Sequence, residues 1–130
     1  MRILIAEDDL ASRTFMLKFL SAYGDCDLTV DGIEAVEAFM MAHSMKQPYD
    51  LICLDIMMPK VDGIKALKVI RQLETQQDIP EDQRVKVIMT TALTDTEVVH
   101  DSFDSGCEAY AAKPIDTAKF IKVMQNLKVI

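Results

Sequence analysis

The sequence is poor in the features that would place it in several common classes of protein. Its three cysteines (Cys26, Cys53 and Cys107) are an odd number and form no CxxC pair, so a disulfide framework or a structural zinc site is not expected. They read as reduced, mostly buried thiols of a cytoplasmic protein. No apolar run approaches the ~18 residues of a membrane span, and no cationic leader precedes the first apolar segment. We therefore expect neither a membrane anchor nor a secretion signal.

Positive charge is also scarce. Fourteen Lys and Arg against 21 Asp and Glu give a net charge of −7 at pH 7. This charge disfavours non-specific binding to nucleic acid or to an anionic membrane, so we expect neither as a direct partner. Half of the residues are hydrophobic and 27% are charged, as in ordinary globular domains. We predict one domain over residues 1–130, with no output domain in this chain.

Short apolar segments alternate with helical patterns along the chain. Strands are predicted at 2–6, 27–30, 50–54, 85–90 and 108–112. The first intervening helix should end at Gly24, and the fourth is marked by Val99 and Phe103. Five strand–helix units in succession predict an α/β fold, in which helices cover both faces of a five-stranded parallel sheet.

The third and fifth helical segments carry more specific expectations. In the third, apolar residues from Ile64 to Leu73 recur at helical spacing, and we expect Lys65, Lys68 and Arg71 to face outward. The segment 74–83 is polar, lacks apolar periodicity and reads as a loop. Asp116 is the predicted N-cap of the last helix.

Polar residues stand at the ends of four of the predicted strands. Asp55 closes the most apolar strand, although a buried strand normally stays apolar to its end. The carboxyl ends of parallel strands meet at one edge of a sheet, which is where open α/β folds place their sites. The other strand ends bring further groups to this edge: Glu7, Asp8 and Asp9; Thr90, Thr91 and Ala92; Lys113 and Pro114.

Several carboxylates at one edge repel one another and raise one another's pKa. A divalent cation relieves that repulsion, and Mg²⁺ (or Mn²⁺) suits a sparse set of carboxylates, carbonyls and waters. Lys113 adds a positive charge and Thr91 a hydroxyl, both of which suit an anionic group carried on Asp55.

These motifs resemble those of the response-regulator receiver domains of two-component signalling, including the single-domain chemotaxis regulators. The resemblance covers the whole chain and rests on four segments: Ile3 to Asp8, Leu54 to Pro59 with Asp62 and Gly63, Met89 to Ala92, and Tyr110 to Pro114. It implies the doubly wound flavodoxin-like fold with strand order 2-1-3-4-5.

The resemblance also implies roles for individual residues. Asp55 would be the phosphorylated residue, with Asp8 bound to the metal directly, Glu7 through water, and the main-chain carbonyl of Met57 as a further ligand. The register rests on Arg13, five residues after Asp8; a shift of one residue would exchange Asp8 with Asp9.

The switch and the partners follow from the same resemblance. Lys113 would bind the phosphoryl group, Thr91 and Ala92 would contact it, and Tyr110 would be the aromatic ring that turns as Thr91 moves. The donor would be a sensor histidine kinase or a phosphotransfer protein. A downstream effector would bind the face formed by the fourth helix, the fifth strand and the fifth helix.

Two apolar residues suggest a long-lived phosphorylated state. Met57 lies two residues after Asp55 and Leu93 two residues after Thr91, where the chemotaxis-type regulators have polar residues that orient the attacking water. An apolar pair should misplace that water and slow hydrolysis.

Other functions of a strand-end aspartate fit less well. A haloacid-dehalogenase-like phosphatase needs a second acid two residues after the first, where this chain has Met57. A flavodoxin-type carrier needs a phosphate-binding loop after the first strand, which Glu7, Asp8 and Asp9 would repel, and the chain has no Trp to stack on a flavin. No Ser/His/acid or Cys/His set is evident, so we expect a signalling protein rather than an enzyme. The remaining alternative is a degenerate receiver-fold scaffold that acts without phosphorylation.

Overall fold

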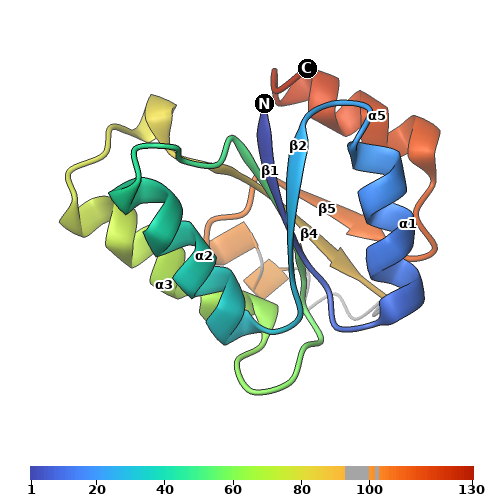
Figure 1. The fold of residues 1–130 in the computed structure, drawn as a ribbon, viewed down its shortest axis with the longest axis horizontal. Coiled ribbons are helices and arrows are strands. Elements are labelled where there is room, and N and C mark those ends of the chain that lie inside the picture. The colour runs from blue at the N-terminus through green and yellow to red at the C-terminus, as the bar shows by residue number, and fades with distance from the viewer. Residues whose placement is uncertain (93–99, 102) are drawn as a thin grey trace.

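Five parallel strands form one sheet in the order β2-β1-β3-β4-β5 (Figure 1). The strands are β1 Arg2–Ala6, β2 Asp25–Thr29, β3 Leu51–Asp55, β4 Lys86–Thr91 and β5 Ala109–Ala112. The structure is a computed structural model that describes residues 1–92, 100, 101 and 103–130. The predicted α/β class and strand order are confirmed, and the observed strand limits lie within two residues of the predicted ones.

Helices cover both faces of the sheet. They are α1 Leu10–Leu20, α2 Gly32–Ser44, α3 Gly63–Gln76 and α5 Thr117–Asn126. Figure 1 shows α2 and α3 on one face and α1 and α5 on the other, as right-handed crossovers require. Each of the four begins after an aspartate whose side chain accepts a backbone N–H three residues later, and Asp116 is one of them, as predicted.

Two details of the helices differ from the predictions or lie outside them. Helix α1 ends at Leu20, before Gly24, and a short turn connects it to β2. Of the predicted fourth helix, residues 100, 101, 103 and 104 are helical, whereas Val99 lies outside the described residues.

The core lies in two layers, one on each side of the sheet. All five residues of β3 are buried, because this strand lies between β1 and β4 and under helices on both faces. Its side chains alternate between the layers: Leu51 and Cys53 pack toward α1 and α5, while Ile52 and Leu54 pack toward α2 and α3. This central strand ends in Asp55 and therefore delivers a carboxylate to the edge of a dry core.

Arg71 does not face outward as the α3 pattern predicted, and that prediction is wrong. Only 15% of its side chain is exposed. Its guanidinium donates to the Gly106 carbonyl at 2.8 and 3.0 Å, to the Val85 carbonyl at 2.9 Å, to Glu74 at 2.7 Å and to Glu108 at 2.9 Å. Glu74 lies on α3 itself, but the other acceptors lie just before β4 and β5, and helical periodicity within α3 cannot reveal them.

The predicted loop 74–83 is also partly wrong. Helix α3 continues to Gln76, and Glu81–Gln83 forms a 3-10 turn. Glu74 is buried because one carboxylate oxygen accepts from Arg71 while the other accepts from the Val85 N–H at 2.9 Å. A buried carboxylate is tolerated when paired and hydrogen-bonded in this way.

Among the helices of the described segments, none combines the length and the apolar character that crossing a bilayer would demand. Cys26, Cys53 and Cys107 are free thiols, and two of them, Cys53 and Cys107, are buried. The prediction of unpaired, mostly buried cysteines is confirmed.

Candidate functional site

Asp55 lies at the carboxyl edge of the sheet, between the ends of β1 and β4. It is paired in register with Thr90, and Leu54 before it is paired with Ala6. Only 3% of Asp55 is exposed, and Glu7, which follows β1, is equally buried. The topology therefore brings two buried carboxylates together from positions 48 residues apart in the sequence.

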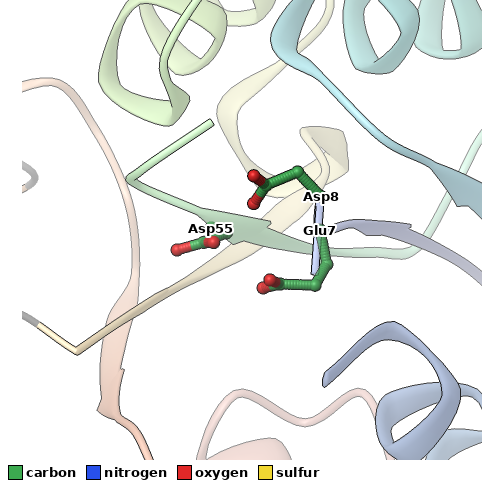
Figure 2. Close-up of side chains that lie close together, drawn as sticks. All are labelled: Glu7, Asp8 and Asp55. Atoms are coloured by element: carbon green, nitrogen blue, oxygen red, sulfur yellow. The ribbon is translucent and has the colours of Figure 1, made fainter. Parts of the chain in front are cut away.

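Three carboxylates meet at this point. Oxygen atoms of Glu7, Asp8 and Asp55 all lie within 4.8 Å of one another. Figure 2 shows the side chains of Glu7 and Asp8 extending from the end of β1 toward Asp55. Asp8 is exposed, so the cluster opens to solvent on its side. The spacing and chemistry of these oxygens fit a hard divalent cation such as Mg²⁺, with water to complete its shell.

Lys113 supplies positive charge to the same cluster. Its Nζ atom lies 2.7 Å from Glu7 Oε2 and 3.2 Å from Asp55 Oδ2. The residue follows β5 directly, and its backbone N–H donates to the Thr91 carbonyl at 2.8 Å. Burial alone would lower the pKa of Lys113, but its hydrogen bond to Glu7 and the charge of Asp55 raise that pKa above its ordinary value.

The protonation of Asp55 reflects its surroundings. Burial first, and then the charge of Glu7, raise the pKa of Asp55 to about 6 against the lowering effect of Lys113. One lysine thus offsets the repulsion between the two acids only in part. A divalent cation at the cluster would favour the ionised, nucleophilic form of Asp55.

Asp9 has a different role from its two acidic neighbours. Its carboxylate accepts from the Ser12 N–H at 2.9 Å and caps α1, and this bond lowers its pKa. Arg13 donates to the main-chain carbonyls of Glu7 at 3.0 Å and Asp8 at 3.2 Å and so fastens the backbone that carries both acids. Sequence spacing identified Arg13 only as a marker of register, and its contacts required the fold.

The loop after Asp55 is held close to the strand end. The Met57 N–H donates to Asp55 Oδ1 at 3.3 Å, while 60% of Met57 is exposed. Gly63 begins α3 so close to β3 that a Cβ atom there would lie 2.1 Å from the Asp55 carbonyl oxygen. Only glycine permits this approach, which brings the α3 amino end beside the acids.

The predicted switch residues lie along the neighbouring strand ends. Thr91 is fully buried at the end of β4, and Ala92 after it is exposed. Tyr110 is half-buried on β5, in register with Met89. Leu93, the second predicted determinant of hydrolysis, lies outside the described residues.

A hollow of about 290 Å³ adjoins the carboxylate cluster. Glu7, Thr90 and Lys113 line it on the side of the sheet, and Phe15 and Met16 of α1 line the other side. The sequence does not indicate this position of Phe15, because an apolar residue in a helical segment predicts only a packing face.

Comparison with known proteins agrees with this geometry. The family model for the response regulator receiver domain matches residues 3–125. The chemotaxis protein CheY of Treponema pallidum is 31% identical over 123 residues, covering 93% of this chain and 78% of that protein. A probable histidine kinase 2 of rice (Oryza sativa subsp. indica) is 30% identical over 98% of this chain, which spans only 13% of that kinase.

A solved structure shows the same arrangement of strands and helices. It is the CheX–CheY–BeF3–Mg²⁺ complex from Borrelia burgdorferi, matched with a TM-score of 0.84 and 27% identity over all of this chain and 90% of that one. The fold and the strand-end acids define a receiver module of two-component signalling. The chain belongs to the response-regulator receiver family.

Proposed function

We propose that this chain accepts a phosphoryl group on Asp55 in a Mg²⁺-dependent reaction and relays the signal through a change of conformation. The observation that carries the proposal is the position of Asp55, buried at a strand end beside two further carboxylates, with Lys113 in contact with both Asp55 and Glu7. A buried acid with no reaction to perform would not be expected to keep so unfavourable an environment.

The donor would be the phosphohistidine of a sensor histidine kinase or of a phosphotransfer protein. A carboxylate oxygen of Asp55 attacks phosphorus, the P–N bond to the donor imidazole breaks, and an acyl phosphate forms. Mg²⁺ would be held by Asp8, by Glu7 through water, and by the Met57 carbonyl with Asp55, and it would offset charge on the transferring group. The free thiols favour a reducing compartment, and we place the reaction in the cytoplasm.

Lys113 has two parts in this proposal. In the resting state its ammonium group pairs with both Glu7 and Asp55 and offsets part of their negative charge. After transfer it would bind a phosphoryl oxygen, a favourable exchange because the phosphoryl group adds negative charge to Asp55.

The signal would then pass through β4 and β5. Thr91 and the Ala92 backbone would bond the phosphoryl oxygens, and the space vacated by the Thr91 side chain would admit the Tyr110 ring. The Thr91 carbonyl accepts a hydrogen bond from the Lys113 N–H, and this bond links the end of β4 to the end of β5. An effector would read the changed surface formed by the fourth helix, β5 and α5.

Chemical phosphorylation followed by trapping tests the proposal directly. The protein is incubated with acetyl phosphate and Mg²⁺, reduced with borohydride to trap the acyl phosphate, and mapped by mass spectrometry. We expect label on Asp55 alone, none in Asp55→Asn and none with EDTA. Label on another carboxylate would contradict the assignment, and the absence of label at any Mg²⁺ concentration would favour a non-phosphorylated scaffold.

A further inference from the structure

The exposed apolar side chains of this protein are concentrated on β2 and α2. Of the twelve large apolar side chains exposed among the described residues, six lie between residues 28 and 45. Three of them are Leu28, Met41 and Met45, exposed by 40%, 63% and 62%. These three line a common hollow, and exposed apolar side chains that form one patch mark an interaction site more often than scattered ones do.

These three side chains surround one hollow. Its volume is about 320 Å³, and its lining comes from β2, from the second half of α2 and from Tyr49. From α2 and its C-cap, the lining residues are Ala38, Met41, Ala42 and Met45. Their spacing of i, i+3, i+4 and i+7 forms a single stripe along the helix. The hollow lies beside β2, which is one of the two edge strands of the sheet.

The form of this stripe suits a helical partner. Two alanines allow another backbone to come close, and two methionines provide flexible, polarisable walls that adapt to inserted side chains. An amphipathic helix docks into such a groove by placing its own apolar stripe against it. The hollow has the volume of one or two large aliphatic or aromatic anchors.

The charge around the hollow determines which charge a partner helix should carry. Helix α2 contains Glu34 and Glu37 but no lysine or arginine, and Asp27 of β2 lines the hollow with 53% of its side chain exposed. Arg2, the basic residue of the lining, forms an ion pair with Asp27, so these two charges offset each other. The exposed carboxylates of Glu34, Glu37 and Asp25 leave the surrounding surface negative. A second copy of this chain would bring its own charge of −7 to the contact and be repelled.

We propose that the groove between β2 and the second half of α2 is a docking site for a basic amphipathic helix of a partner protein. The site is separate from the hollow beside Asp55, which is lined by α1 and by residues around Lys113. It does not depend on phosphorylation, and Asp55→Asn should bind the partner helix as wild type does.

The test uses a synthetic peptide of about 15 residues with leucines on one helical face and lysines on the other, a length at which a helix is marginally stable alone. Binding is measured by calorimetry and mapped by NMR with ¹³C-methyl methionine, since nine methionines report from across the molecule. We expect shifts at Met41 and Met45, little change at Met57, and several-fold weaker binding in high salt.

The neighbouring Met40 provides the matched control. It is 48% exposed on the same helix but does not line the hollow. Met41→Gln/Met45→Gln should weaken peptide binding at least tenfold, whereas Met40→Gln should change it less than twofold. All three substitutions are uncharged and on exposed positions, so the fold and the net charge are retained.

Three results would overturn the proposal. Equal binding of a scrambled peptide of the same composition would show attraction by charge alone. Equal affinity of the Met41→Gln/Met45→Gln and Met40→Gln variants would show that the groove is not used. Shifts of Met41 and Met45 that depend on protein concentration without peptide would assign the surface to self-association.

Discussion

At the scale of single residues, neighbouring acids in the sequence have different surroundings and therefore different predicted roles. Glu7 is buried against Lys113, Asp8 is exposed beside Asp55, and Asp9 caps α1. Sequence patterns predicted that acids would gather here. Sequence patterns left open an exchange of Asp8 and Asp9, because the backbone conformation after β1 decides which side chain points toward Asp55. The structure places Asp9 as the cap of α1, and this favours Asp8 as the metal ligand.

Metal binding should separate Asp8 from Asp9. Asp8→Ala removes a carboxylate from the cluster and should weaken Mg²⁺ binding by about tenfold or more, roughly 1.4 kcal/mol per factor of ten. Asp9→Ala removes only the helix cap and should lower the free energy of unfolding modestly, with little change in Mg²⁺ affinity. Calorimetric Mg²⁺ titration and urea unfolding of both variants give the comparison. A larger loss of affinity in Asp9→Ala would show that the register of the acids is shifted by one residue.

The lifetime of the acyl phosphate should depend on the exposed side chain next to the acceptor. We predict that Met57→Asn/Leu93→Glu shortens the half-life several-fold, because polar side chains there can orient an attacking water. The measurement is the rate at which phosphorylated protein, not reduced with borohydride, loses its phosphate under saturating Mg²⁺. Met40→Gln serves as a distant exposed control. A double variant no faster than wild type would show that these side chains do not control the water.

At the scale of elements, the Arg71 cluster joins α3 to the amino ends of β4 and β5. Apolar periodicity predicted α3 well, since its buried face follows a helical repeat. It failed at Arg71 and Glu74 because their burial depends on polar groups of the segments that precede β4 and β5. Residue type and spacing predict which face of a helix packs against an apolar core. They contain little information about polar groups that are buried because they pair with each other.

Removal of Arg71 should therefore be costly. Arg71→Met leaves Glu74 buried without its cation and deprives the Val85 and Gly106 carbonyls of a donor. We predict a loss of about 3 kcal/mol in the free energy of unfolding. Lys68→Met, on an exposed position of the same helix, should change it by less than about 0.5 kcal/mol. Urea unfolding measures both, and similar values for the two variants would contradict the role assigned to the cluster.

At the scale of the whole molecule, the site is a source of instability in the folded protein. The pKa of Asp55 in the folded protein, about 6, lies above the ordinary aspartate value of 3.8. Below about pH 3.8 Asp55 is protonated in the folded and the unfolded protein, and it costs no stability. As pH rises through about 6, the unfolded protein ionises this group more readily than the folded protein does, so stability is lost. A fold that retains an ionised acid at this point gives up stability at neutral pH in the absence of metal.

Replacement of the acid should recover that stability. In EDTA at pH 7.5 we expect Asp55→Asn to be more stable than wild type by about 1–3 kcal/mol, with the gain shrinking toward zero as pH falls to about 4. Added Mg²⁺ should stabilise wild type more than the variant and narrow the difference. Urea unfolding across this pH range tests the sign, and a gain that grows on acidification would contradict the raised pKa.

The two ends of the described chain lie side by side, at the edge of the sheet opposite the acids. Met1 and Val129 line the same hollow, and Figure 1 shows both termini together. Five-residue strands separate this edge from Asp55 by roughly 17 Å at about 3.3 Å per residue. A tag, a fluorophore or a surface linker attached at either end is thus presented away from the acceptor. A sensor chip coated through either terminus would leave the edge that holds Asp55 facing the flowing solution.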